Sequence, residues 1–307
     1  MPSHRTPKPA GPARRPWLLR PACAPLRRLR GRAWAAAAWA TVFAVFLAAG
    51  CTTTSTRQTT IQALDGILAG TQRSEANRAR DRYRHPKDTL LFFGIRPEMR
   101  VLEVWPEPGW YTEVIAPLVR AKGRYYAGVI APNPESRSIS NSLDSYRNKL
   151  ASRPDLYDRV AVATFPTDGT DALPPNSVDM ILTFRNLHNW MARGEASKAF
   201  ATMYRALKPG GVLGVEEHRG VRGAPQDPLA KSGYVDEDYA VKLIEAQGFK
   251  LVAKSQVNAN LRDTKDYEQG VWTLPPTYRL GDRDREKYAA IGESDRSTLK
   301  FVKLRKP

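Results

Sequence analysis

Short apolar segments alternate with helical segments along most of the chain, and this alternation limits the folds open to it. Seven segments are rich in Val, Ile, Leu and aromatic residues, as expected of buried strands. They are residues 100–105, 124–130, 160–165, 178–184, 212–217, 250–257 and 299–304. Strands that alternate with helices form a parallel sheet covered on both faces, with right-handed crossovers. The sequence therefore predicts a doubly wound α/β fold with a seven-stranded, mostly parallel sheet.

The intervening segments have helical spacing of apolar residues and end at helix-breaking residues. The segment 196–207 ends at Lys208-Pro-Gly-Gly, and the segment 236–247 ends at Gly248. Further helices are expected over residues 73–93 with an interruption at Pro86, over 111–121 and over 140–151.

One interval breaks the alternation. Residues 258–298, between the sixth and seventh predicted strands, are rich in charge, proline and aromatic side chains. A loop of this length in a compact domain is usually functional or disordered. A parallel sixth strand would end at the carboxyl edge of the sheet, where ligands bind. We therefore expect this insertion to cover the ligand cleft.

The charge of the chain is divided unevenly. The net charge is +17, but residues 1–50 hold nine of the 48 Lys and Arg and none of the 31 Asp and Glu. The remaining chain has an excess of eight basic residues, interspersed with acids and without a long basic run. This pattern disfavours nucleic acid as a partner. Two cysteines, Cys23 and Cys51, and four histidines exclude a disulfide framework and a clustered Cys/His zinc site, and no metal is expected.

The N-terminal 50 residues have the organisation of an export signal. Residues 1–32 are rich in Arg and Pro, and residues 33–50 are uncharged and end in small residues. The following Ala48-Ala-Gly-Cys51 resembles a bacterial lipobox, in which the cysteine carries the lipid, although Ala48 stands where Leu is usual. The resemblance implies a leader over 1–50, lipidation of Cys51 and a flexible Thr-rich tether over 51–72. The alternative is an uncleaved membrane anchor or a plain secretory signal.

Three motifs follow predicted strands. Val101 to Thr112 (V-L-E-V-W-P-E-P-G-W-Y-T) combines a strand, a turn with glycine and a helix start, which suits close contact with a ligand. Ser177 to Trp190 contains S-V-D-M-I-L, and Ala206 to Glu217 contains L-K-P-G-G-V-L. In this order the motifs resemble those of the class I S-adenosylmethionine-dependent methyltransferases over about residues 90–304.

This resemblance implies a Rossmann-like sheet with an antiparallel last strand, S-adenosyl-L-methionine as cofactor and a methyltransferase-like domain over residues 73–307. The chain is also similar to a group of bacterial exported methyltransferase-like proteins. The segments shared with that group are R-Y-R-H-P, W-P-E-P-G-W-Y-T-E, G-V-W-T-L-P-P and E-S-D-R-S-T-L-K-F-V-K.

The resemblance assigns a cofactor-binding role to residues near the carboxyl ends of the strands. They are Glu103, Trp105, Gly109, Asn133, Asp168 and Asn186. The sequence departs from the family pattern at two of its three glycine positions, where Trp105 and Glu107 stand. The second strand also lacks a clear acid for the ribose hydroxyls, for which Asn133 is the substitute. Alternatively, Gly109 only forms a turn and Asp168 is a solvated turn residue.

The acceptor side is assigned to residues after the fourth and fifth strands. His188 is the catalytic candidate, because an imidazole can take a proton from an acceptor near neutral pH. Tyr111, Glu217, His218 and Trp272 are substrate candidates. The alternatives are a packed His188, acids that neutralise nearby arginines, and aromatic residues that only hold the insertion in place. Arg80 to His85 is expected to be a solvated helix face.

Two functions remain open at this point. The first is a methyltransferase of the cell envelope, attached as a periplasmic lipoprotein to the outer membrane if there is one, that acts on a small molecule or an envelope component. An inner-membrane or secreted location is the alternative. The second is a catalytically inactive binding protein with the methyltransferase fold, which the departures at Trp105 and Glu107 favour. The sequence determines neither the acceptor nor the oligomeric state.

Overall fold

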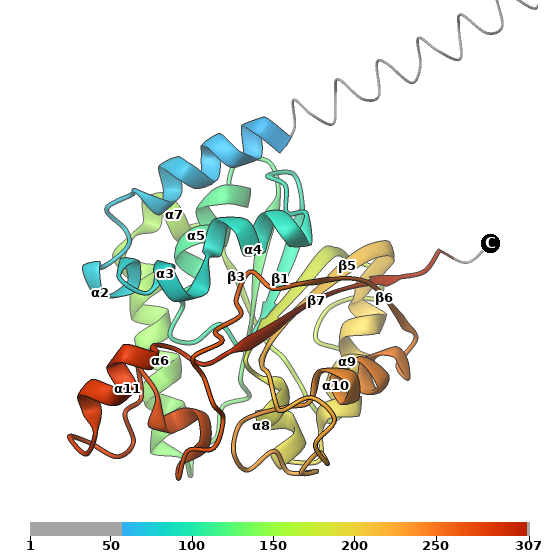
Figure 1. Ribbon diagram of the computed structural model, residues 1–307. Coiled ribbons are helices and arrows are strands. Elements are labelled where there is room, and N and C mark those ends of the chain that lie inside the picture. The colour runs from blue at the N-terminus through green and yellow to red at the C-terminus, as the bar shows by residue number, and fades with distance from the viewer. Residues whose placement is uncertain (1–56, 306–307) are drawn as a thin grey trace, which may run out of the picture. The chain divides into compact units, whose positions relative to one another are not determined.

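A seven-stranded sheet forms the centre of the computed structural model, which describes residues 57–305 (Figure 1). The strands are β1 (Arg100–Val104), β2 (Arg124–Val129), β3 (Ala161–Thr164), β4 (Val178–Phe184), β5 (Leu207–His218), β6 (Phe249–Ser255) and β7 (Arg296–Lys303). Their order is β3-β2-β1-β4-β5-β7-β6. The first five pair in parallel, and β7 pairs antiparallel with both β5 and β6. The predicted doubly wound, mostly parallel sheet with an antiparallel last strand is confirmed.

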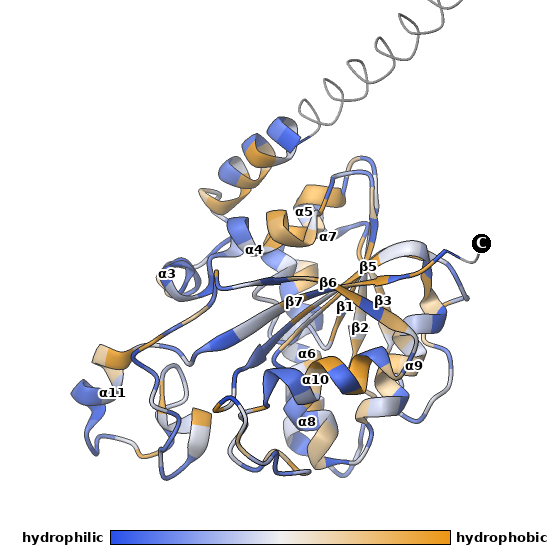
Figure 2. Ribbon diagram, turned by 45° about the vertical axis from the view of Figure 1, so that its right-hand side comes forward, coloured by the Kyte–Doolittle hydropathy of each residue, from blue (hydrophilic) through white to orange (hydrophobic). Residues whose placement is uncertain are grey.

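Helices cover both faces of this sheet. They are α2 (Glu75–Arg78), α3 (Asp81–Arg84), α4 (Pro86–Phe93), α5 (Thr112–Val119), α6 (Arg137–Ser152), α7 (Pro154–Tyr157), α8 (Leu187–Ala192), α9 (Ala196–Ala206), α10 (Glu237–Glu245) and α11 (Arg285–Ile291). Figure 1 shows α9 and α10 on one side of the sheet and α4 and α5 on the other. Figure 2 shows the two-sided hydropathy of α10, whose Ala240 and Ile244 are buried.

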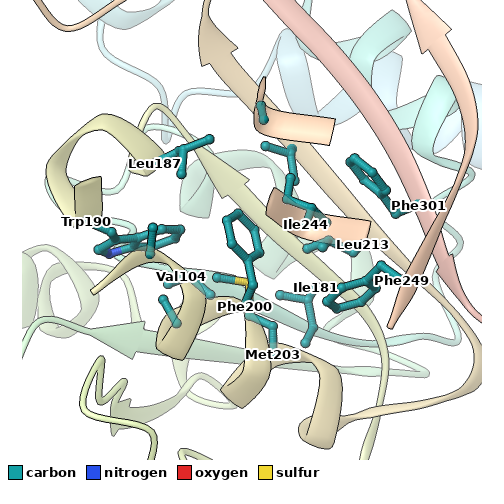
Figure 3. Packing of buried hydrophobic residues seen from close by; sticks show 14 of the residues in the cluster. Val104, Ile181, Leu187, Trp190, Phe200, Met203, Leu213, Ile244, Phe249 and Phe301 are labelled. Atoms are coloured by element: carbon teal, nitrogen blue, oxygen red, sulfur yellow. The ribbon is translucent and has the colours of Figure 1, made fainter. Parts of the chain in front are cut away.

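The two faces bury separate apolar clusters because successive side chains of a strand point to opposite faces. Leu102 and Val104 belong to the cluster under α8, α9 and α10, part of which Figure 3 shows. Val101 belongs to the cluster under α4, α5 and α6. Strands buried on both faces have continuous apolar runs, and this explains why β1 and β4 are evident in the sequence.

The predicted tether over 51–72 is wrong for residues 57–68, which are helical. Leu64 is fully buried, and Ile67 and Leu68 pack against the cluster of α4 and α5. The Thr-rich composition of residues 52–60 conceals this helix, because its apolar anchors all come after the Thr-rich run. Residues 1–50 and Cys51 lie outside the described residues, as do the predicted leader and lipid site.

The helical prediction for residues 73–93 corresponds to three short helices, and Pro86 begins the last of them, α4. β5 is longer than predicted: it begins at Leu207, so Lys208-Pro-Gly-Gly is part of the strand rather than only a helix stop. Within residues 57–305, no helix is both long enough and apolar enough to cross a membrane.

The insertion between β6 and β7 has secondary structure of its own. It contains the 3-10 helix η1 (Gly270–Thr273) and α11, and β7 already begins at Arg296 rather than at 299. Trp272 of η1 stacks edge-on against His188, with ring centroids 5.9 Å apart. Ser294 lies against His218, so the insertion contacts the ends of β4 and β5.

Candidate active site

A cavity of about 200 Å³ lies where β1 and β4 end, with α2 and α3 on its other side. Its wall includes Glu103 at the end of β1, the loop of residues 105–108 and the start of α5. The full set of lining residues is Asn77, Arg80, Arg84, Glu103, Trp105, Pro106, Glu107, Pro108, Trp110, Tyr111, Phe184, Arg185 and Asn186. Ligands bind at this edge of doubly wound sheets.

Glu103 is buried in this wall, and Tyr125 Oη donates a hydrogen bond to its carboxylate at 2.6 Å. Burial raises the pKa of Glu103 to about 8, and the nearby Glu107 acts in the same direction. Glu103 therefore holds a proton at neutral pH unless a cationic ligand group approaches it.

The loop after β1 replaces the expected glycines with two large side chains that point in different directions. Trp105 has a φ of 51°, and its indole packs edge-on against Trp190. Its Nε1 is buried and has no hydrogen-bond partner among residues 57–305. Glu107 instead reaches the end of β2, where its Oε1 accepts a hydrogen bond from the backbone nitrogen of Ile130 at 3.2 Å.

Gly109 has a packing role in the structure. Its φ of 86° favours glycine, but it does not line the cavity. A Cβ atom there would lie 3.0 Å from Tyr146 Cε2 and from Lys149 Cδ on α6. The space beside Gly109 is filled by protein, so the residue has a role in turn formation and helix packing, and its role in approaching the cofactor stays a prediction.

Asn133 and Asp168 lie on exposed turns and are not among the residues that line the cavity. Asn133 Oδ1 accepts a hydrogen bond from the backbone nitrogen of Glu135. Asp168 Oδ1 accepts hydrogen bonds from the backbone nitrogen and hydroxyl of Thr170, which lower the pKa of Asp168. Both have local turn roles here. Asn186, in contrast, lines the cavity and donates to the Val104 carbonyl oxygen at 2.9 Å.

Four of the predicted acceptor-side residues contact one another after β4 and at the end of β5. His188 Nδ1 lies 2.9 Å from Glu217 Oε1, and Glu217 also accepts hydrogen bonds from the backbone nitrogens of His188 and His218. The His188 and His218 rings are 5.2 Å apart, and His218 Nδ1 lies 2.5 Å from Ser294 Oγ. With Trp272, the insertion completes this group, which we call the histidine cluster: His188, Glu217, His218 and Trp272.

The histidine cluster also has metal-type side chains, since ligand atoms of His188, Glu217 and His218 lie within 4.8 Å of one another. Burial, then the neighbouring His188 and Arg185, lower the pKa of His218 well below its ordinary value, so its imidazole is held in the neutral form. Glu217 is the carboxylate that fixes the His188 ring.

Glu216, the residue before Glu217 in β5, binds arginines of the protein. It is fully buried and pairs with Arg185 at 2.8 Å and with Arg296 at 3.0 Å. Burial opposes its ionisation, but these two guanidinium groups hold its pKa below the ordinary value.

Tyr111 is also buried, at the floor of the cavity. Its ring stacks on Phe184 with centroids 3.6 Å apart, and its hydroxyl lies 3.5 Å from Glu216 Oε2. The ring therefore presents a face and not a free hydroxyl to a ligand.

Arg80, Arg84 and Arg185 were not predicted as site residues. The segment Arg80 to His85 was expected to be a solvated helix face, and this expectation is wrong. Arg84 is 5% exposed, and both Arg80 and Arg84 pair with Glu293 of the insertion. The signal available was the spacing of four between Arg80 and Arg84, which places both on one side of a helix.

Comparison with known proteins agrees with this architecture. A model of the family described as "Methyltransferase domain" matches residues 115–215. No curated protein matches the sequence. A SAM-dependent methyltransferase from Aquifex aeolicus is similar in structure, with a TM-score of 0.50, 18% identity and coverage of 74% of this chain and 93% of that one. The [4+2]-cyclase SpnF has a TM-score of 0.53 and 17% identity, with coverage of 78% and 86%.

These matches show the fold that S-adenosylmethionine-dependent methyltransferases share, and the family matched by residues 115–215 is one of methyltransferase domains. They do not indicate an acceptor. One of the similar structures is a cyclase, which illustrates that a shared fold does not determine the reaction.

The residues present fit the methionine end of this cofactor. Trp105, whose indole nitrogen has no partner among residues 57–305, lines the cavity together with Glu103 and Asn186. The volume of about 200 Å³ is below the roughly 300–1,000 Å³ of typical ligand pockets.

Proposed function

We propose that the protein is an S-adenosylmethionine-dependent methyltransferase whose acceptor is a small molecule or a component of the cell envelope. The observation that carries the proposal is that the cavity and the histidine cluster lie at the same edge of the sheet, since Asn186 lines the cavity and His188 of the cluster follows two residues later in α8. A donor bound in the cavity and an acceptor at the cluster would lie at one edge of the sheet, as in-line transfer requires.

The cofactor site would be formed by the end of β1, the loop after it and the second residue after β4. Glu103 would accept the ammonium group, and Asn186 and the Trp105 Nε1 would offer donors. Glu107 would take the place of the acid that β2 lacks, because its hydrogen bond to Ile130 already fixes its carboxylate at the end of β2. The bound sulfonium supplies an activated methyl group, so the chain itself must align the partners and exclude water.

His188 would contact the acceptor and take up its proton where the acceptor has one to lose. Glu217 positions the imidazole through Nδ1, which leaves Nε2 for the acceptor. Trp272 would cover the acceptor from the insertion, since it already packs against His188.

The export signal and lipidated Cys51 belong to the same proposal and would place the enzyme in the envelope as a lipoprotein. The alternative, a binding protein without catalytic activity, is favoured by the small volume of the cavity and by the size of Trp105 and Glu107 in the β1 loop.

The test is calorimetric titration of the purified protein with S-adenosylmethionine and S-adenosylhomocysteine, followed by methyl transfer to candidate acceptors. Micromolar binding, about −8 kcal/mol, is expected for a methyltransferase. His188→Ala should lower turnover by about 10²–10⁴-fold and leave S-adenosylhomocysteine affinity unchanged. His85→Ala is the matched control, since His85 lies outside both the cavity and the cluster. A folded protein that binds neither compound would support the binding-protein alternative.

A further inference from the structure

Three arginine side chains meet on one wall of the cavity. Arg80 and Arg84 come from α3 and its N-terminal flank, and Arg185 follows β4. Arg84 is stacked over Trp110, with its Cζ 4.8 Å from the ring centroid. Arg80 Nη2 is buried and has no hydrogen-bond partner among residues 57–305. An unpartnered buried guanidinium nitrogen beside a cavity is costly unless a ligand satisfies it.

The carboxylates that neutralise this wall are too few. Glu293 pairs with Arg80, Arg84 and Arg296, and Glu216 pairs with Arg185 and Arg296. Four guanidinium groups thus share two carboxylates, which leaves an excess of two positive charges.

The opposite wall does not remove this excess. Glu103 is protonated near neutral pH because burial raises its pKa to about 8. Burial also raises the pKa of Glu107. Even with Glu107 ionised, one uncompensated positive charge remains in the cavity.

The pKa of Arg84 reflects the same imbalance. Burial lowers it, the neighbouring Arg185 lowers it further, and Glu293 does not restore it, so the value falls to about 9. Arginine ordinarily resists such a change. An anion in the cavity would relieve this strain among like charges.

We propose that Arg80, Arg84 and Arg185 form a binding site for a carboxylate or phosphate group of a ligand. Arg84 uses Nε, and Arg185 uses Nη1, for its glutamate partner, so each guanidinium group keeps nitrogens outside these pairs. Together with Arg80 Nη2 they would give the anion charge-assisted hydrogen bonds from three directions. Arg is suited to this role because its planar donors match both groups.

Two sources of the anion share this chemistry. One is the carboxylate of the cofactor's methionine end, and the other is an anionic acceptor. The site depends only on the cavity and its charges, so it does not rest on the proposed methyl transfer.

The experiment uses inorganic phosphate as the probe, titrated by calorimetry into the full chain with and without saturating S-adenosylhomocysteine. A second titration compares S-adenosylhomocysteine with its decarboxylated analogue. The variant is Arg80→Gln, which leaves Glu293 paired with Arg84 and Arg296. Arg120→Gln is the matched control, because Arg120 pairs with Asp158 on the surface away from the cavity. Arg80→Lys, which keeps the charge but not the fork, replaces Arg80→Gln if the latter does not fold.

We expect Arg80→Gln to lower the affinity for phosphate or for S-adenosylhomocysteine by about tenfold or more. Arg120→Gln should lower neither affinity. Phosphate that binds equally with and without S-adenosylhomocysteine indicates the acceptor as the source. The cofactor is indicated as the source by two results together. S-adenosylhomocysteine displaces phosphate, and the decarboxylated analogue binds the wild type more weakly than S-adenosylhomocysteine does, a difference that disappears in Arg80→Gln. The proposal is overturned if phosphate affinity and the effect of decarboxylation are both the same in the wild type and Arg80→Gln. Phosphate binding without S-adenosylhomocysteine binding would reject the proposed function and keep the anion site.

Discussion

At the scale of single residues, Glu103 makes the stability of the protein depend on pH. The folded carboxyl has a pKa of about 8 because it is buried, against 4.5 for an ordinary glutamate. Between these values the folded state keeps a proton that the unfolded state releases, so stability is highest below about pH 4.5 and falls as pH rises towards 8. The loss from this residue is at most about 4–5 kcal/mol, at about 1.4 kcal/mol per unit.

Glu103→Gln should remove this contribution, because an amide stays neutral and can still accept the hydrogen bond of Tyr125. Urea unfolding at about pH 5 and pH 8 measures the difference. The variant should be more stable than the wild type at the higher pH, whereas Glu135→Gln on an exposed turn should change little. Equal pH dependence in the wild type and Glu103→Gln would contradict the assigned burial.

Gly109 has two structural constraints that can be separated by mutation. Gly109→Ala combines a φ of 86° with a Cβ only 3.0 Å from Tyr146 and Lys149, and it should lower the free energy of unfolding by about 1–3 kcal/mol. Gly194→Ala is the control, since its φ of 68° is also positive but nothing lies within 4 Å. Thermal unfolding of the two variants should show a larger loss at Gly109. Equal losses would mean that packing against α6 contributes nothing.

The candidate site was only partly predictable at this scale. Glu103, Asn186 and His188 follow directly from their place after a strand, because parallel strands bring their carboxyl ends together. Arg80 and Arg84 were missed since their partner Glu293 is more than 200 residues away in sequence. The contact of the Glu107 side chain with the end of β2 was not predictable either, because it depends on the path of a loop rather than on a local sequence pattern.

At the scale of elements, the helix of residues 57–68 is part of the folded domain. Leu64→Ala should cost about 2–5 kcal/mol in unfolding free energy, because the side chain is fully buried against the cluster of α4 and α5. Leu261→Ala, at a side chain that is 97% exposed, is the control and should be nearly neutral. Chemical denaturation measures both. A neutral Leu64→Ala would restore the interpretation of this segment as a tether.

The strands were predicted more closely than the structure inside the insertion. β4 has the predicted limits, and six of its seven residues are buried. The insertion was expected to be a long loop, but it contains the short helices η1 and α11. These helices depend on contacts with the ends of β4 and β5, which the local sequence pattern does not predict.

At the scale of the whole molecule, the charge of the chain has two parts with different consequences. Residues 1–50 account for about half of the excess of +17, and in the folded domain the unbalanced positive charge lies partly inside a cavity rather than on a surface. Charge inside a cavity selects a small ligand, whereas nucleic acid requires an exposed basic face. The distribution therefore agrees with a small anionic partner.

The location of the protein determines how S-adenosylmethionine can reach it, since this cofactor is made in the cytosol. Cys51→Ser separates the alternatives for the leader, because a lipid can be attached only to the cysteine. If Cys51 is lipidated, the full chain expressed in a bacterial host should sediment with membranes and incorporate labelled palmitate, and Cys51→Ser should lose the label and be largely released from the membrane fraction. Cys23→Ser is the matched control and should behave as the wild type. If the wild type sediments with membranes but carries no label, residues 33–50 act as an uncleaved anchor instead, and release of the unlabelled wild type would indicate a plain secretory signal. A methyltransferase outside the cytosol needs cofactor carried out with it, whereas a binding protein does not.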